Sequence, residues 1–306
     1  MFKRKRFYSL ILLMIIFLVY MFVKEFQDSK LEIVDYPQLE MPKKSDENLD
    51  VNLHSSNAIL VNLDTKMILL DKGSDEMIYP ASLTKIMTVL VAIENIPNLQ
   101  EKILLPKSIF KDLYEENATM AGFLPNEEVT AEDLLYGTML PSGADASIGL
   151  ADYIAGSERK FVKLMNEKAK QLGMKNTHFK NTTGLHHPDH YTSVKDISIL
   201  LQYALTNKTF RDIYTAEKYS IKSTNLHPEG MTVSSRMFKN LDANEKMRGE
   251  IIGGKTGYTE QAGLCLASLA TINGEEYILV TVGAEGDSRT EQFNITDALA
   301  VYRQLN

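Results

Sequence analysis

The sequence predicts a single α+β domain, in which strands from both ends of the chain form one sheet around a mainly helical middle. Short apolar runs bounded by turn residues occur at about residues 57–71 and return after residue 218. Between them, apolar residues recur at helical spacing over about residues 131–205. Strands that flank a block of helices are typical of an α+β fold.

The composition is that of a globular protein. The 306 residues are 44% hydrophobic and 24% charged, which argues against a disordered, collagen-like or coiled-coil chain. The net charge is −7, but residues 1–26 carry five basic side chains and one acidic side chain, so the rest carries −11. An acidic body lacks the basic surface expected of a general nucleic-acid binder. The one cysteine, Cys265, excludes an intrachain disulfide framework, and its apolar neighbours predict a buried strand residue.

The amino terminus predicts a membrane anchor. Four basic residues precede an uncharged run at residues 7–23, and this run as a helix would rise about 25 Å, the short limit for crossing a bilayer. A cleaved signal peptide is the alternative, but it needs small residues after the run, and the first alanine is Ala58. We therefore expect residues 1–23 to be a cytoplasmic basic tip and a transmembrane signal-anchor. Because basic clusters stay in the cytoplasm, we expect a single-pass cell-membrane protein whose domain is extracytoplasmic.

Residues 24–55 predict an extracytoplasmic linker. They are rich in Asp, Glu, Lys and Asn, contain Pro37 and Pro42, and show no sustained apolar period. The alternative is an irregular arm packed against the domain, for which residues 31–34 are a candidate. Residues 56–306 are expected to form the folded domain.

The elements of this domain follow in order. Residues 57–64 and 67–71 predict a hairpin. Pro80 precedes a helix expected at about residues 82–95, with apolar residues on one face. The remaining expectations are helices at about 131–138, 143–155, 158–172 and 193–205, strands at about 218–223, 250–257, 263–270 and 276–283, and a final helix at about 290–303.

A Ser-x-x-Lys segment, Ser82 to Lys85, carries residue types that are typical of nucleophilic catalysis. Residues i and i+3 share one face of a helix, so the hydroxyl and the amine can meet. A lysine can take the serine proton once burial or a second cation lowers its pKa, and N–H groups at a helix start can stabilise an oxyanion. Taken alone, the segment is also an ordinary helix cap.

Two further segments extend this pattern. Ser142, in Pro141–Ala146, offers a second hydroxyl for proton relay, whereas Lys255 and Thr256 in Gly253–Tyr258 can dock a carboxylate on a strand. Each segment alone would be an ordinary helix start or turn. In this order, Ser-x-x-Lys, a Ser-x-Asn-like element and Lys-Thr-Gly are the signature of penicillin-binding proteins and class A β-lactamases.

The chain resembles the D-alanyl-D-alanine carboxypeptidases, the low-molecular-mass penicillin-binding proteins of peptidase family S11. The resemblance covers roughly residues 55–285 and implies that residues 56–306 are a D,D-peptidase catalytic domain. Its fold would be the transpeptidase-like fold that penicillin-binding proteins share with β-lactamases, an antiparallel sheet with a helical lobe. The blocks that carry the resemblance are Asn62–Thr65, Tyr79–Thr88, Asn181–Leu185, His190–Ser193 and Gly254–Thr259.

The resemblance implies the catalytic roles. Ser82 would attack the carbonyl between the two terminal D-alanines and form an acyl-enzyme. Lys85 would accept its proton, and Ser142 would complete the relay. Water would then release the acyl group, with no metal and no organic cofactor.

The resemblance also implies the binding roles. Lys255 and Thr256 would hold the terminal carboxylate. Gly257, which has no side chain, would let the substrate lie close to the strand. The backbone N–H groups of Ser82 and Tyr258 would form the oxyanion hole. The implied partners are peptidoglycan stem peptides that end in D-Ala-D-Ala, with β-lactams as covalent inhibitors. No nucleic-acid partner is expected, because the body of the chain is acidic.

One position departs from the family pattern. Ala144 stands where the family usually has an asparagine that hydrogen-bonds the substrate's peptide group and helps to orient the lysine. The loss of one such contact costs on the order of 1–3 kcal/mol, up to about a hundredfold in rate. A non-catalytic or impaired penicillin or peptidoglycan receptor is therefore the alternative function. The next residue, Asp145, is expected to point elsewhere because neighbouring helical positions face different directions.

A β-lactamase and a zinc enzyme have less support from the sequence. A class A β-lactamase adds a glutamate that activates the deacylating water, but no Glu-x-x-Leu-Asn occurs between Ser142 and Lys255. The histidines of residues 186–190 suggest zinc, but no His-Glu-x-x-His helix or distant ligand set accompanies them. We therefore predict a serine-type D-Ala-D-Ala carboxypeptidase that removes the terminal D-alanine of stem pentapeptides, a hydrolase of cell-wall peptidoglycan.

Overall fold

The computed structural model describes residues 41–45, 49–241, 250–287 and 289–305. The predicted signal-anchor at residues 1–23 and the first part of the predicted linker lie outside these residues. Within the described ranges, no helix combines the length and the apolar character needed to cross a membrane.

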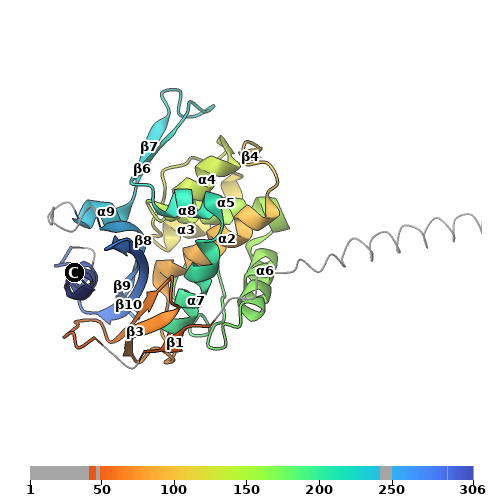
Figure 1. Ribbon diagram of the computed structural model, residues 1–306. Helices are drawn as coiled ribbons and strands as arrows, with labels where there is room; N and C mark the ends of the chain where they lie inside the picture. Colours follow the sequence, from red (N-terminus) through yellow and green to blue (C-terminus); the bar gives the residue numbers. More distant parts are fainter. Residues whose placement is uncertain (1–40, 46–48, 242–249, 288, 306) are drawn as a thin grey trace, which may run out of the picture. The chain divides into compact units, whose positions relative to one another are not determined.

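A six-stranded sheet forms the centre of the body, in the order β1-β3-β2-β10-β9-β8 (Figure 1). Its strands are β1 (Lys43–Lys44), β2 (Asn57–Asn62), β3 (Met67–Lys72), β8 (Ile251–Thr259), β9 (Gly263–Ile272) and β10 (Glu275–Ala284). Neighbouring strands are antiparallel except β1 and β3. Strand β10 pairs with β2, with Tyr277 opposite Asn62, so both ends of the chain build one sheet, as predicted.

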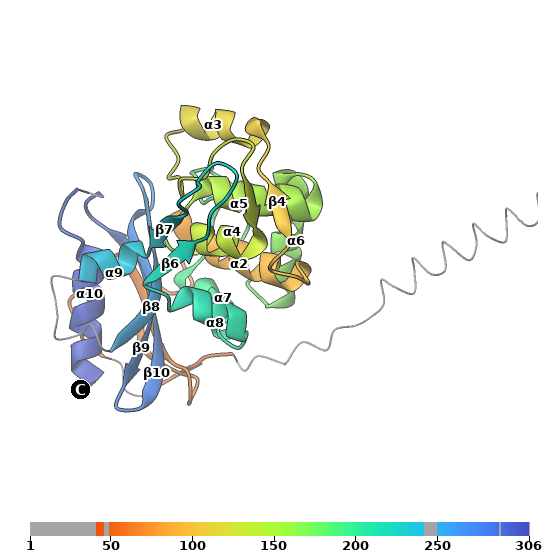
Figure 2. The same ribbon diagram turned by 90° about the horizontal axis from the view of Figure 1, so that it is seen from above.

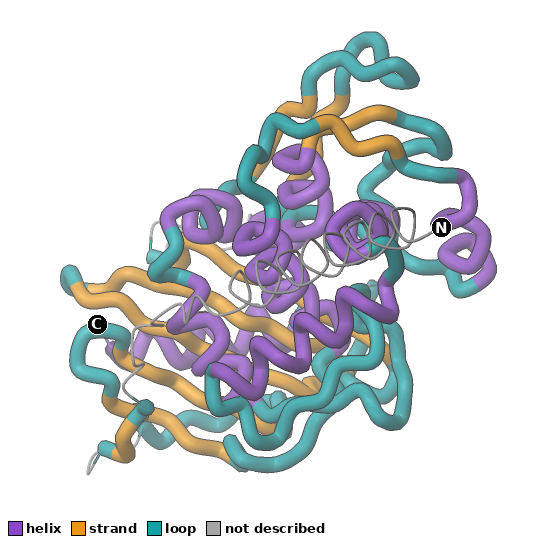
Figure 3. Tube along the Cα trace, turned by 90° about the vertical axis from the view of Figure 1, so that its right-hand side faces the viewer, coloured by secondary structure: helices purple, strands orange, loops and turns teal. Residues whose placement is uncertain are grey.

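Helices cover both faces of this sheet, as Figure 2 shows. On one side lies the predicted helical lobe, whose helices lie in front of the strands in Figure 3. Its helices are α2 (Thr84–Asn95), α4 (Ala131–Met139), α5 (Ala144–Ala155), α6 (Glu158–Gln171), α7 (Val194–Ala204) and α8 (Lys208–Tyr214). On the other side lie α9 (Arg236–Leu241) and α10 (Phe293–Tyr302). The predicted α+β class is confirmed.

Local sequence signals explain where several of these helices begin and end. Helix α4 begins with a capping box, because the Thr130 hydroxyl accepts from the Asp133 N–H and the Asp133 carboxylate accepts from the Thr130 N–H. Ser193 caps α7 by accepting from the N–H of Asp196. Helix α5 ends at Gly156, which has φ +69°.

The apolar core lies on both faces of the sheet. All six residues of β2 are buried, which fits a central strand covered on both sides. On the α10 side, Leu60, Leu266 and Leu279 belong to one buried cluster with Ala298 and Tyr302. The Tyr302 hydroxyl lies 2.9 Å from Ser268 Oγ, so its polar end is satisfied inside this core.

The structure also contains short elements that the sequence did not predict. They are β4 (Lys102–Leu104), α3 (Phe110–Glu115), β5 (Glu128–Thr130), β7 (Met231–Ser234), α8 and α9. Strand β7 pairs with β6 (Lys218–Ile221) to form a hairpin between α8 and α9. These elements have three to seven residues, too few for a hydrophobic period to stand out.

The end of the predicted linker packs against the domain in the structure. Strand β1 pairs with β3, and Leu53 is buried. The Ser55 hydroxyl donates to the Asp297 carboxylate over 2.6 Å, and the backbone N–H groups of His54 and Ser55 donate to the same carboxylate. The described part of the linker, residues 41–45 and 49–55, therefore lies on the folded body.

Candidate active site

The Ser-x-x-Lys segment lies at the start of the helical lobe, beside the sheet. Ser82 sits in a single 3-10 turn, Ala81–Leu83, and α2 begins only at Thr84. The sequence predicted an α-helix from residue 82, whereas the structure has a tighter 3-10 turn there and begins the α-helix two residues later. Ala81 has φ +45°, a conformation that a residue with a side chain rarely adopts. Strained backbone of this kind clusters at functional sites, and here it directly precedes the predicted nucleophile.

Lys85 contacts the hydroxyl of Ser82. Its Nζ lies 3.3 Å from Ser82 Oγ and also donates to the backbone carbonyl of Thr183. The side chain is 2% exposed. Burial lowers the pKa of Lys85 to about 7, with a smaller lowering by the Arg236 cation. A neutral amine at this position can accept a proton from the serine.

The loop that carries the Thr183 carbonyl packs tightly against the turn that holds Ser82. The next residue, Gly184, has φ +81°. A Cβ at this position would lie 1.9 Å from the carbonyl oxygen of Ala81 and 2.9 Å from the Ser82 nitrogen. The glycine therefore allows the 181–184 loop to approach the Ala81–Leu83 turn closely enough for the Thr183 carbonyl to accept from Lys85.

Ser142 occupies the turn between α4 and α5. It has φ +71° and is 3% exposed, and its Oγ has no hydrogen-bond partner among the described residues. The serine nevertheless lines the same cleft as Ser82. A buried hydroxyl without a partner is costly unless a ligand or water satisfies it. Ser142 is therefore available to a molecule in the cleft.

Ala144 and Asp145 begin α5 directly after this turn. Ala144 is buried and has an apolar side chain, and its N–H donates to the backbone carbonyl of Thr119 over 2.7 Å. The Asp145 carboxylate accepts from the backbone N–H groups of residues 121, 122 and 123 at 2.8–3.2 Å. The Asp145 side chain thus holds the loop after Thr119 and does not replace the missing asparagine.

Strand β8 carries the Lys-Thr-Gly segment past Ser82. A Cβ on Gly257 would lie 3.0 Å from the Ser82 nitrogen, so strand and turn are in close contact at this glycine. Lys255 is 1% exposed and donates to the Thr256 carbonyl over 2.8 Å. Burial, and then the cations of Lys85 and Arg236, hold the pKa of Lys255 well below its usual range.

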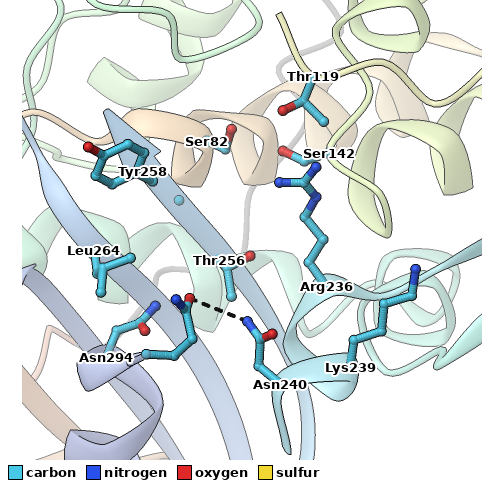
Figure 4. A pocket seen from close by; sticks show the side chains of 12 residues that line it. Ser82, Thr119, Ser142, Arg236, Lys239, Asn240, Thr256, Tyr258, Leu264 and Asn294 are labelled. Carbon is cyan, nitrogen blue, oxygen red and sulfur yellow. Dashed lines mark hydrogen bonds between the residues drawn. The ribbon is translucent and has the colours of Figure 1, made fainter. Parts of the chain in front are cut away.

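These segments meet in a cleft of about 390 Å³ between the helical lobe and β8 (Figure 4). Ser82, Ser142, Thr256, Gly257 and Tyr258 line it, which are five of the seven predicted site residues. The other two, Lys85 and Lys255, are buried behind this lining. The sequence did not indicate the remaining lining residues, which are Thr119, Arg236, Lys239, Asn240, Leu264, Gln292 and Asn294.

The histidines of residues 186–190 do not converge. His190 is buried, its Nε2 lies 2.9 Å from Thr84 Oγ1, and burial lowers its pKa to about 3. His186 packs edge-on against Tyr79 instead. In the ranges that the structure describes, no group of three His, Cys, Asp or Glu side chains is placed to hold a metal. Cys265 is buried in β9 as predicted, and burial raises its pKa to about 12.

Comparison with known proteins places this chain in a family. A model of peptidase family S11, described as D-alanyl-D-alanine carboxypeptidase, matches residues 42–286. The chain is 37% identical over 237 residues to D-alanyl-D-alanine carboxypeptidase DacF of Bacillus subtilis, covering 75% of this chain and 57% of the relative. It is 32% identical over 238 residues to DacC of Escherichia coli, covering 75% of this chain and 56% of that relative. The chain thus spans little more than half the length of these two relatives.

Solved structures of the same kind resemble this one. The crystal structure of the Streptomyces K15 DD-transpeptidase superposes with a TM-score of 0.75 at 27% identity, covering 83% of this chain and 98% of that chain. Penicillin-binding protein 5 of Haemophilus influenzae gives a TM-score of 0.72 at 26% identity, covering 84% and 72%. The fold expected from the sequence is therefore confirmed.

Proposed function

The chain belongs to peptidase family S11, the D-alanyl-D-alanine carboxypeptidases, and on this premise we propose that it removes the terminal D-alanine from peptidoglycan stem pentapeptides. The contact that carries the proposal is the hydrogen bond from Lys85 Nζ to Ser82 Oγ at 3.3 Å, on the border of a cleft that also holds Ser142 and Thr256. A nucleophile and its base within reach of each other are the core of acyl transfer.

The reaction begins when Ser82 Oγ attacks the carbonyl carbon of the penultimate D-alanine. The hydroxyl proton passes to the neutral Nζ of Lys85, which the lowered pKa makes available. The backbone N–H groups of Ser82 and Tyr258 stabilise the oxyanion, which is supported by the close contact between the catalytic turn and Gly257. The peptide C–N bond then breaks, leaving an ester on Ser82.

The leaving amine needs a proton as that bond breaks. Ser142 passes one from Lys85 to the amine, a role supported by its buried Oγ without a partner. Water then attacks the ester carbonyl, and Lys85 takes one of its protons. The ester C–O bond breaks, Lys85 gives that proton to Ser82 Oγ, and the shortened peptide leaves. The products are free D-alanine and a peptide one residue shorter. The same ester chemistry makes β-lactams covalent inhibitors, which acylate Ser82 as the ring opens.

The test is D-alanine release by the purified full-length protein. We expect release from a peptide that ends in D-Ala-D-Ala, no release by Ser82→Ala, and a covalent adduct on Ser82 after treatment with labelled penicillin. Equal release by wild type and Ser82→Ala would refute the proposed nucleophile. A stable penicillin adduct without peptide hydrolysis would instead support the receptor function suggested by Ala144, and rapid β-lactam turnover would support a β-lactamase.

We also propose a place in the cell for this activity. Residues 1–23 would anchor the protein in the cell membrane in a single pass, residues 24–55 would link the anchor to the domain, and the domain at 56–306 would act on the wall outside. The apolar run at residues 7–23 behind a basic cluster supports the proposal. Deletion of residues 1–23 is expected to release the protein from the membrane fraction. A mature protein whose mass lacks these residues would favour the cleaved signal.

A further inference from the structure

The His190–Ser193 block takes no part in the proposed reaction, yet it packs beside the Ser-x-x-Lys segment. Thr192 pairs with Ile78 through two backbone hydrogen bonds of 2.8 and 2.9 Å, which fixes the block near the start of the helical lobe. His190 is 2% exposed, and its ring packs edge-on against Phe179. A buried imidazole needs hydrogen-bond partners for both of its nitrogens.

A chain of hydrogen bonds runs from the His190 ring to the backbone just before Ser82. His190 Nε2 lies 2.9 Å from Thr84 Oγ1, and that hydroxyl donates to the carbonyl of Ala81 over 2.8 Å. A hydroxyl has one proton, so Thr84 Oγ1 accepts from His190, whose Nε2 bears the hydrogen. The other ring nitrogen, Nδ1, accepts from the Lys180 N–H at 3.4 Å. The ring is therefore the neutral tautomer with its proton on Nε2.

Burial keeps this tautomer neutral. It lowers the pKa of His190 to about 3, with smaller lowering by the basic groups at positions 178, 187, 85 and 186. A second proton would have to sit on Nδ1, against the Lys180 N–H. Because the pKa of Lys85 is about 7, the chain from His190 to Ala81 keeps one direction of donation wherever Lys85 can act as a base.

The Ala81 carbonyl at the end of this chain controls the direction of the Ser82 N–H. The two groups belong to one planar trans peptide, in which C=O and N–H point to opposite sides. Thr84 holds this carbonyl twice, with its hydroxyl and with its backbone N–H. The Ser82 nitrogen lies beside β8, since a Cβ on Gly257 would be 3.0 Å from it. Its N–H is one of the two donors of the proposed oxyanion hole.

We propose that His190 is a positioning residue, which acts through Thr84 to hold the Ala81–Ser82 peptide with its N–H aimed at the oxyanion. Donors of this kind stabilise a transition state best when they are oriented before the charge develops. Ala81 has φ +45°, so this peptide needs contacts from outside the turn to keep its orientation. The assignment rests on the proposed acyl transfer at Ser82. In this role His190 contacts no substrate and transfers no proton.

The first experiment replaces the ring by two amides of different reach in the full-length protein. A glutamine side chain can bring its N–H donor to the place of Nε2, whereas an asparagine is shorter and ends near the place of Nδ1. kcat and KM for D-alanine release, and the rate constant for acylation by a penicillin, are measured for wild type, His190→Gln and His190→Asn.

The two amides are expected to differ in rate. We expect His190→Asn to lower kcat and the acylation rate constant about 10- to 100-fold, part of the loss that follows removal of an oxyanion donor. KM is expected to change less than about threefold, because the oxyanion forms only in the transition state. His190→Gln is expected to restore both rates to within about threefold of wild type.

Thr84 provides an independent test of the chain. Thr84→Val removes the hydroxyl and keeps the branched shape, and Thr84→Ser keeps the hydroxyl as the matched control. We expect Thr84→Val to lower kcat about as much as His190→Asn. The double variant is expected to lie within about threefold of either single variant, because both changes break the same chain. Losses that multiply in the double variant would mean that the two side chains act separately, which would overturn the proposal.

A histidine of the same region, His178, is the control for a merely structural effect. It is half-buried, and its Nδ1 lies 2.6 Å from the carbonyl oxygen of Asp189, so His178→Asn exchanges a second hydrogen-bonded ring for the same amide. We expect this variant to keep the wild-type kcat, and thermal unfolding is measured for all variants. Equal kcat for His190→Asn and His190→Gln, or a lower melting temperature with wild-type kcat, would limit His190 to packing and overturn the proposal.

The pH profile separates positioning from proton transfer. In His190→Gln the apparent pKa near 7 is expected to remain, because it belongs to Lys85; a lost or shifted limb would make His190 a proton carrier and overturn the proposal. If His190→Asn does not fold, equal kcat for Thr84→Val and Thr84→Ser would overturn it instead. Failure of the carboxypeptidase function is distinguishable, because wild type would then release no more D-alanine than Ser82→Ala, while penicillin acylation would still rank the variants.

Discussion

The glycine at position 184 controls how closely the 181–184 loop approaches the Ala81–Leu83 turn, and Gly184→Ala tests that control. The new Cβ would lie 1.9 Å from the Ala81 carbonyl oxygen. Because contacts of this kind are rarely shorter than about 3.0 Å, the loop and the turn must separate by about 1 Å. That shift moves the Thr183 carbonyl away from Lys85 Nζ and displaces Ser82. A 1 Å misplacement of reacting groups costs about 100-fold in rate.

Two quantities are measured. One is the second-order rate constant for acylation by a penicillin, obtained by mass spectrometry, and the other is the rate of D-alanine release. We expect Gly184→Ala to lower both about 100-fold. The matched control is Gly173→Ala, because Gly173 has a similar φ of +74° but no atom within 4 Å of the added Cβ. Gly173→Ala carries only the free-energy cost of an alanine at positive φ, about 1 kcal/mol, without the clash. If Gly184→Ala acylates as fast as Gly173→Ala, the loop does not position the lysine and the reasoning fails.

Three more measurements test the site. kcat/KM is expected to rise with pH through an apparent pKa near 7, because Lys85 must be unprotonated to act as the base; a pH-independent profile between about 5 and 9 would contradict this. Ala144→Asn is expected to raise D-alanine release up to about tenfold, since it restores an amide beside Ser142; equal or lower release means that the family role does not transfer to this position. Asp145→Asn is expected to lower the free energy of unfolding by about 1–3 kcal/mol, measured by urea unfolding, because an amide replaces an acceptor of the loop's N–H groups; unchanged stability would show that these bonds contribute little.

The long elements and the segments of the candidate site were predictable because each carries its own local signal. The helix at 143–155 and the strands at 263–270 and 276–283 were expected within about two residues of α5, β9 and β10, since apolar period and turn residues define them. The family blocks indicated Ser82 and Lys255 without any structure.

The wall of the cleft was not predictable in this way. Arg236 belongs to a six-residue helix, and in the sequence its two basic residues look like those of any solvent-exposed helix. Only the tertiary fold brings Arg236 opposite Ser142. The 3-10 turn at Ser82 was also unforeseen, because its backbone conformation depends on contact with residues 184 and 257, far along the chain. Such long-range contacts leave no periodic signature in the sequence.

The pairing of β2 with β10 has a consequence for how the chain folds. Asn57–Asn62 is an early, wholly buried strand, yet the partner that covers one of its edges is Glu275–Ala284, near the other end of the chain. Such non-local pairing slows folding, and until β10 arrives this apolar strand has an open edge that invites aggregation. A nascent or shortened chain that lacks β10 would therefore be exposed to misassembly, and refolding yield should fall sharply when the chain ends before residue 275.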